Sequence, residues 1–212
     1  MQGRQWGILA AALAVAVTAR AETVFPPAEI LAWDQRTYVG ESDFTLVEHD
    51  GETVLRVRCD GRAASGYFLE REIDLAETPV LEWSWRLDDG FSDIDETEEE
   101  GDDYVLRVFA VDRHTVLRWR TRALNYVWAS EQPQGSDWPN PYQHVAHNVA
   151  LRSGVPEDGG VWHTERRNLR DDFREYHDRD VGSVDAIAVI ASCDDTGQSA
   201  EGRYGTFRLL PE

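Results

Sequence analysis

The sequence feature that most constrains the fold is an alternation of apolar and polar residues with a period of two. The clearest case is VLEWSWRL (80–87), in which apolar side chains occupy every second position. Successive side chains of a β-strand point to opposite faces, so this pattern predicts a strand with one buried face. By this test, or by a continuous apolar run, about ten strands are predicted, at 43–49, 53–59, 66–73, 80–87, 103–111, 115–128, 145–152, 161–169, 184–193 and 204–210.

Helical signals are scarce. The stretch RDDFREYHD (170–178) predicts one short helix, because its first turn carries the acidic residues that a helix dipole favours. Many short strands joined by loops, with a single helix, are typical of an all-β protein. We therefore expect a two-sheet β-sandwich, and the long loops between strands favour the jelly-roll type.

The N-terminus predicts export. Arg4 precedes an apolar run from Trp6 to Val17, and the small-residue pattern Ala19-Arg20-Ala21 follows. This is the arrangement of a secretory signal peptide, so we expect residues 1–21 to be removed after Ala21. An uncleaved anchor is the alternative, but the run is short for a membrane span of roughly 20 residues. Residues 22–212 then form one domain without a transmembrane segment, periplasmic or extracellular.

The charge balance is strongly acidic. The chain has 40 Asp and Glu residues against 21 basic residues, all of them arginine. Loss of Arg4 and Arg20 with the signal peptide leaves 19 arginines and a formal charge of −21. Such a charge argues against nucleic acid as a partner and against docking on anionic lipid. An acidic surface also suits a salt-rich medium.

Only two cysteines are present, Cys59 and Cys193, each at the end of a predicted strand. Export makes a disulfide between them chemically possible. Two buried free thiols are the alternative, because the sequence does not give the separation of the two Cα atoms.

The strongest candidate site lies on the neighbouring strands 103–111 and 115–128. Arg107 projects from an otherwise apolar face, so it needs a carboxylate, a carbonyl or a ligand. Asn125, Tyr126 and Trp128 can join it if the two strands bring them to one surface. Aromatic rings beside amide and guanidinium donors suit sugars, whose C–H faces stack on rings. Alternatively, the two aromatic residues are core residues and Arg107 is paired internally, for example with Glu82.

A long loop rich in turn-forming residues, SEQPQGSDWPNPY (130–142), follows these strands. It contributes Trp138, Asn140 and Tyr142, and loops of this length carry function when they are ordered.

Two acidic segments are candidate cation sites. The loop DDGFSDIDETEEEGDD (88–103) contains a cluster of carboxylates, and Asp194-Asp195-Thr196 directly follows the predicted strand 184–193. Carboxylates are the oxygen ligands that calcium takes, so Asp194 and Asp195 can hold a structural calcium ion; no other cofactor is expected. The alternatives are a solvated acidic loop at 88–103 and a turn capped by an aspartate side chain at 194–196.

A fourth group is titratable, with His144, His147 and His163 near Glu165, Arg166 and Asp172 in sequence. Paired carboxylates at a cleft can run glycosidic acid-base chemistry, and a histidine with a tyrosine can support a lyase. Neither a serine-nucleophile motif nor zinc-type spacing is present. Surface histidines without a catalytic role are the alternative.

Several motifs together resemble one known family. GDDYVLRVFAV, RALNYVWAS, WPNPYQHV, ERRNLRDDF and IASCDDTGQSAEGRYGTF occur in order over nearly the whole mature chain, from about Trp33 to Leu209. This set is similar to the exported bacterial family called domain of unknown function 3047. The resemblance implies a jelly-roll β-sandwich of no established activity. By this resemblance, the residues that occupy motif positions of the family are Asp102, Asp103, Arg107, Asn125, Tyr126, Trp128, Asn140, Arg167, Asn168, Asp172, Asp195, Thr196 and Gly197.

The chain departs from the family pattern at two places. The family tends to have a basic residue shortly before Gly-Asp-Asp, where this chain has Glu98, Glu99 and Glu100. It also tends to have an aspartate near the position of Cys193. That difference weakens a three-carboxylate metal site and favours a disulfide with Cys59.

The sequence therefore predicts a non-catalytic exported protein that binds a saccharide or cell-envelope glycan on one sheet face. The expected ligand-binding residues are Asp103, Arg107, Asn125, Tyr126, Trp128, Asn140, Arg167 and Asp172. One alternative is a polysaccharide hydrolase or lyase in which Asp103, Asp172 or Glu165 does acid-base work. Another is a structural protein without a ligand. No oligomeric state follows from the sequence.

Overall fold

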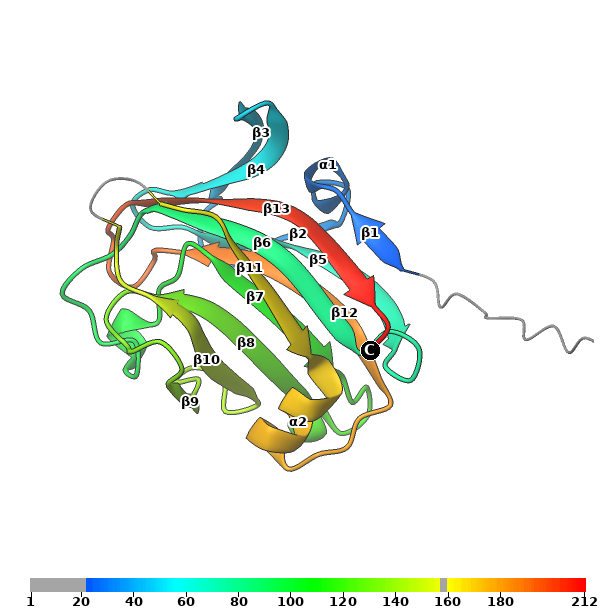
Figure 1. Cartoon of the computed structure of the whole chain (residues 1–212). Coiled ribbons are helices and arrows are strands. Elements are labelled where there is room, and N and C mark those ends of the chain that lie inside the picture. The colour runs from blue at the N-terminus through cyan, green and yellow to red at the C-terminus, as the bar shows by residue number, and fades with distance from the viewer. Residues whose placement is uncertain (1–21, 157–159) are drawn as a thin grey trace, which may run out of the picture.

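The computed structural model describes residues 22–156 and 160–212, and the expected signal peptide (1–21) lies outside the described residues. Within that part of the chain, 13 strands form two sheets packed as a β-sandwich (Figure 1). The all-β prediction is confirmed. Among the described residues, no helix has both the length and the apolar character needed to cross a membrane.

One sheet has six strands. Its order is β11 (His163–Asn168), β6 (Val80–Asp89), β13 (Ala200–Leu210), β4 (Glu52–Cys59) and β3 (Asp43–His49), and β1 (Thr23–Phe25) also pairs with β13. All pairings in this sheet are antiparallel. The β3–β4 hairpin extends beyond the rest of the sandwich (Figure 1).

The other sheet has seven strands and carries the candidate site. Its order is β2 (Asp34–Thr37), β5 (Ala64–Asp74), β12 (Ser183–Ser192), β7 (Arg107–Asp112), β8 (Arg122–Ala129), β10 (Ala146–Ser153) and β9 (Asp137–Pro139). β8 and β10 pair in parallel, whereas the other pairs are antiparallel. A parallel pair needs a long connection, and the loop 130–145 supplies it.

The predicted helix is present as α2 (Leu169–His177), one residue earlier than expected. The Asn168 side chain caps it by accepting the backbone N–H groups of Arg170 and Asp171, which would otherwise lack partners. Asp178 ends it in a left-handed conformation with φ 49°. Shorter helical turns are α1 (Pro27–Ile30), η1 (Glu99–Gly101) and η2 (Arg118–Arg120).

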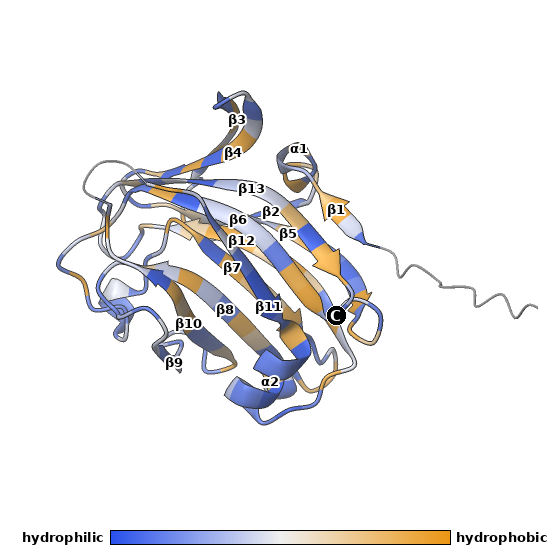
Figure 2. Cartoon of the chain, in the orientation of Figure 1, coloured by the Kyte–Doolittle hydropathy of each residue, from blue (hydrophilic) through white to orange (hydrophobic). Residues whose placement is uncertain are grey.

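The core lies between the two sheets. Trp83 and Trp85 of β6 and Phe207 of β13 are fully buried there, and the Trp83 ring stacks on Phe207 with centroids 6.2 Å apart. Buried and less buried residues alternate along these strands, and Figure 2 shows bands of hydrophobic and hydrophilic residues along β8 and β10 of the other sheet. The alternation observed in the sequence is thus the division between the core face and the outer face of each sheet.

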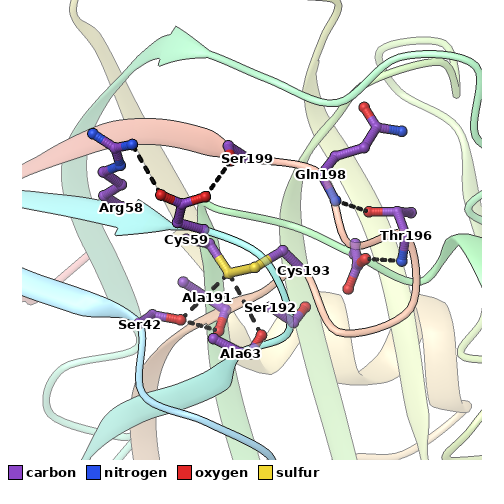
Figure 3. Close-up of a disulfide and its surroundings, with 12 residues drawn as sticks. Ser42, Arg58, Cys59, Ala63, Ala191, Ser192, Cys193, Thr196, Gln198 and Ser199 are labelled. Atoms are coloured by element: carbon purple, nitrogen blue, oxygen red, sulfur yellow. Dashed lines mark hydrogen bonds and ion pairs between the residues drawn. A yellow bond between two sulfur atoms is a disulfide. The ribbon is translucent and has the colours of Figure 1, made fainter.

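A disulfide joins the two sheets. Cys59 ends β4 and Cys193 follows β12, and their Cα atoms are 6.0 Å apart across a sequence separation of 134 residues. Both residues are fully buried. The Ser42 hydroxyl lies 3.5 Å from the Cys59 sulfur and 3.1 Å from the carbonyl oxygen of Ala191, to which it donates (Figure 3). The disulfide therefore fixes the point at which the 194–199 loop leaves β12.

Candidate functional site

The outer face of the seven-stranded sheet carries a row of polar residues among apolar ones. Arg107 and Phe109 of β7 project to this face, and in the sheet register Phe109 lies opposite Asn125 of β8, which in turn lies beside Asn148 of β10. Arg107, Asn125 and Asn148 are all buried. Polar side chains buried on the outer face of a sheet require a further layer of protein or a ligand above them.

Two loops supply part of that layer. Tyr104 and Trp138 form a small buried cluster with Val127, Ala129 and Ala150, which project from the outer face of β8 and β10. These loops are the acidic segment before β7 and the segment that contains β9. They cover β8 and β10 at one end of the face and leave the part around Phe109 open.

Glu96 joins the two loops. Its carboxylate accepts the backbone N–H groups of Ser130, Glu131 and Gln132, and its carbonyl oxygen accepts the Trp138 indole N–H at 2.9 Å. Burial raises the pKa of Glu96. The acidic loop is therefore not fully solvated. Its buried Glu96 side chain binds the segment that contains β9.

Asp102 is the centre of the polar network beneath this cover. Asn140 Nδ2 donates to its two oxygens at 2.9 and 3.0 Å, and Asn148 Nδ2 donates at 3.3 Å. Arg107 Nη1 lies 3.6 Å away. Burial raises the pKa of Asp102, and the attraction of Arg107 only partly offsets it. Asn125 joins the network by donating to Asn148 Oδ1 at 2.7 Å.

Asn140 connects this network to an exposed turn. Its Oδ1 accepts the backbone N–H groups of Tyr142 at 3.2 Å and Gln143 at 2.8 Å. A side-chain oxygen that accepts from residues two and three positions later fixes the local turn. Asn140 therefore sets how Tyr142 and Gln143 project into solvent.

Three buried polar atoms of this region lack a hydrogen-bond partner within residues 22–156 and 160–212. They are Arg107 Nε, Asn125 Oδ1 and Asp103 Oδ1. Arg107 is otherwise engaged, because Nη2 donates to Ser192 Oγ at 3.0 Å. Native proteins satisfy most buried polar atoms, so these three atoms are available for contacts with solvent or a ligand.

A pocket of about 280 Å³ opens at the uncovered end of this face. Phe109 and Ile190 provide apolar surface, and Arg107, Asp102 and Asn140 also line it. Tyr38 and Tyr142 stand at the pocket with 57% and 50% of their surface exposed. An apolar surface with a few fixed polar groups is the usual composition of a small-molecule site.

Three carboxylates meet beside the pocket. One oxygen each from Asp103, Asp194 and Asp195 lies within 4.8 Å of the others, and the last two residues line the pocket. Asp103 Oδ2 accepts the backbone N–H of Thr196 at 2.7 Å, and Asp195 Oδ1 accepts the Tyr142 hydroxyl at 2.7 Å. Burial and the neighbouring negative charges raise the pKa values of Asp194 and Asp195. The structure thus adds Asp103 to the pair expected from the sequence.

The structure does not bring Tyr126 and Trp128 to the surface that holds Arg107. They alternate with Asn125 along β8, so their side chains enter the core between the sheets. The Trp128 indole N–H donates to the carbonyl oxygen of Gly154 at 3.0 Å. The expectation that Tyr126 and Trp128 share one face with Arg107 and Asn125 is wrong, because successive side chains of a strand point to opposite faces.

Arg167 and Asp172 also lie apart from the pocket. Arg167 makes two hydrogen bonds to the Asp172 carboxylate at 2.8 and 2.6 Å, and the hydroxyl of Tyr126 donates to Asp172 at 2.5 Å. Asp172 is only 4% exposed. These three residues join α2 to β11 and to the core face of β8.

The carboxylates expected for an enzyme are separated. Glu165 of β11 accepts the Trp85 indole N–H at 2.9 Å and pairs with Arg152 at 2.7 Å, so it belongs to the other sheet. Asp172 binds the core residue Tyr126, whereas Asp103 binds Thr196 of the loop after β12. The expected histidines are also separated, since His163 lies on β11 of the other sheet, whereas His147 of β10 pairs with Asp137 at 2.6 Å.

Sequence reasoning missed Asn148, Tyr38 and Gln143. Asn148 had a detectable signal, because it alternates with Ala146 and Ala150 on one side of its strand and so predicts a buried amide. Tyr38 had none, since it reaches the pocket only through the pairing of β2 with β5.

Several solved structures are similar to this chain at low sequence identity. A family 11 carbohydrate-binding module from Clostridium thermocellum, solved with a mixed-linked tetrasaccharide, is 11% identical, with 92% of this chain and 98% of that chain covered and a TM-score of 0.46. A cellulase derived from Cel12A of Rhodothermus marinus is 10% identical, with 88% and 98% covered and a TM-score of 0.43. The xylan-binding module CBM86 from Roseburia intestinalis is 10% identical, with 91% and 96% covered and a TM-score of 0.35. Likenesses of this degree imply no common ligand.

No curated protein matches the chain in sequence. A family match covers residues 32–208, close to the span over which the motifs occur, and it confirms the resemblance. The chain belongs to the family described as protein of unknown function (DUF3047).

Proposed function

We propose that this protein binds a neutral saccharide in the pocket beside Arg107, without converting it. The observation that carries the proposal is the combination of two half-exposed tyrosines, Tyr38 and Tyr142, with buried and oriented polar groups in one pocket. A sugar ring presents C–H faces that stack on aromatic rings and hydroxyls that need donors and acceptors.

The polar groups offer both kinds of hydrogen bond. Arg107 Nε is a buried donor without a protein partner among the described residues, and the exposed amide of Gln143 both donates and accepts. The carboxylates of Asp102, Asp194 and Asp195 are acceptors. Because these acids outnumber the single arginine of the pocket, an uncharged sugar fits it better than an anionic one.

The structural alternative accounts for less. Arg107, Asn125 and Asp103 are buried and partly paired, as an internal brace would require. A brace alone does not explain why two large aromatic rings, Tyr38 and Tyr142, stand exposed at the same pocket.

The test is a panel of neutral and anionic glycans, followed by calorimetric titration of any that bind. We expect Tyr142→Ala and Tyr38→Ala each to weaken binding by roughly tenfold, a loss of ~1.4 kcal/mol. Trp119→Ala is the matched control, because this ring is 70% exposed but lies on the β7–β8 connection outside the pocket. If the panel gives no binding, or if the control variant loses as much affinity as the tyrosine variants, the proposal fails.

A further inference from the structure

The three carboxylates beside the pocket have the spacing of ligands to one cation. Their nearest oxygens lie within 4.8 Å of one another. Calcium binds oxygen at about 2.3–2.6 Å, so two oxygens on the same ion are at most about 5 Å apart. Asp194 and Asp195 come from the loop after β12, whereas Asp103 comes from the segment before β7. The arrangement therefore depends on the fold and not on a local acidic run.

Asp103 gives an independent indication of a ligand. Its side chain is fully buried, and Thr196 satisfies only Oδ2, which leaves Oδ1 without a donor within the described residues. Over the same part of the chain, no arginine or histidine nitrogen lies within 4.0 Å of the Asp103, Asp194 or Asp195 carboxylates, and the nearby Arg107 pairs with Asp102. A buried carboxylate without a cation is costly, because charge is stable in the interior only when it is paired or coordinates a metal.

We propose that Asp103, Asp194 and Asp195 bind a divalent cation of the calcium class at the wall of the pocket. The donors are all hard oxygen atoms, with no histidine among them, and both cysteines are in the disulfide. This donor set favours calcium or magnesium over zinc or copper. Calcium takes six to eight ligands in irregular geometry, which suits three carboxylates on two separate segments.

A disulfide and a backbone hydrogen bond fix the conformation of the loop that carries Asp194 and Asp195. Cys193, immediately before the two aspartates, is fixed by the disulfide to Cys59. Gly197 has φ 67° and donates its N–H to the carbonyl oxygen of Cys193 at 3.0 Å, which closes the loop. The remaining cation ligands are water or, if the proposed function is correct, hydroxyls of the bound saccharide.

The experiment is calorimetric titration of the purified chain, stripped of metal with EDTA, with calcium chloride and separately with magnesium chloride. We expect one equivalent of calcium to bind, more tightly than magnesium, and to raise the melting temperature. Asp194→Asn and Asp195→Asn should each weaken calcium binding on the order of tenfold or more, because affinity follows the number of charged ligands. Asp103→Asn should act in the same way if the variant folds.

The matched control is Glu98→Gln with Glu100→Gln, two exposed acids of the nearby acidic loop. This variant should bind calcium as the native chain does. If the control and the aspartate variants respond alike, calcium only screens the acidic surface and the proposal is overturned. It is also overturned if the native chain shows no binding up to ~10 mM calcium, above the range of weak extracellular calcium modules.

A spectroscopic signature tests the location. Terbium replaces calcium at oxygen sites and is excited by a nearby tyrosine ring, and the Tyr142 hydroxyl donates to Asp195 at 2.7 Å. We expect terbium emission that calcium displaces and that Tyr142→Phe reduces severalfold. These measurements need no saccharide, so a failed glycan panel with successful calcium binding rejects the proposed function alone.

Discussion

His177, the last residue of α2, ties its helix to the seven-stranded sheet and is expected to make stability depend on pH. Its Nε2 lies 3.0 Å from the carbonyl oxygen of Ala123, and its ring contacts the rings of Phe173 and His147. Burial lowers the pKa of His177, and the nearby His147, Arg122 and Arg179 lower it further. The folded chain therefore takes up this proton less readily than the unfolded chain does.

The free energy of unfolding should fall as pH drops below about 6.5, the ordinary histidine value, and should show no such loss above pH 7. His177→Gln keeps a donor for the Ala123 carbonyl and should reduce this slope. Urea denaturation at pH 7.5, 6.5 and 5.5 measures it. The exposed His144→Gln serves as the control for removal of a histidine, and equal slopes in the two variants would contradict the assignment to His177.

Individual polar side chains in apolar surroundings were easier to predict from the sequence than the residues that they contact. Arg107 was recognised from its apolar neighbours, and it does line a pocket. Tyr126 and Asn125 are adjacent in sequence but face opposite sides of β8, one in the core and one under the loops. Strict alternation would have separated them in advance. The burial of Asn148 had a local signal, but its pairing with Asn125 had none, because β8 and β10 are parallel and no hairpin joins them.

At the element scale, one buried carboxylate joins α2 to both sheets. Asp172 joins Arg167 of β11 and Tyr126 of β8 to the helix. We expect Asp172→Asn to lower the free energy of unfolding by about 2–4 kcal/mol, because it leaves a largely buried guanidinium without its counter-charge. Urea denaturation measures the loss, and hydrogen exchange should show α2 opening first.

Asp171→Asn is the neighbouring control on the same helical turn. Asp171 is exposed and pairs with Arg174 at 3.1 Å, so its loss should cost at most ~0.5 kcal/mol. A comparable loss in both variants would mean that the helix dipole, and not the buried pair, accounts for the effect.

The elements predicted from the sequence were the long, strongly patterned ones. The strands around 80–87 and 184–193 and the helix near 170–178 are present. The strand expected at 115–128 begins only at Arg122, because residues 113–121 form the connection that contains η2. β1, β2 and β9 have three or four residues each, too few for a period of two to be recognised, and tertiary pairing alone makes them strands.

At the scale of the whole molecule, the disulfide is a covalent link between the two sheets. It closes a loop across a sequence separation of 134 residues. In the chain-entropy description, a loop of this length stabilises the folded state by about 3–5 kcal/mol. We expect Cys59→Ala with Cys193→Ala to lose about that much free energy of unfolding, measured in urea.

Dithiothreitol supplies the control. It should lower the stability of the native chain toward that of the double variant only after prolonged exposure or partial unfolding, because both sulfur-bearing residues are fully buried. The double variant should not respond to it. A native chain that remains equally stable once its thiols are shown to be reduced would contradict a stabilising role.

The strand order has a consequence for the time course of folding. β12 lies between β5 and β7 in the interior of one sheet, and β13 lies between β6 and β4 in the interior of the other. Both central strands come from residues 183–210, near the C-terminus. Most pairings therefore join segments far apart in sequence, a topology that folds slowly. Until those residues are available, β4, β5, β6 and β7 each lack one of their two neighbouring strands. A nascent or truncated chain therefore presents unpaired edges that favour aggregation.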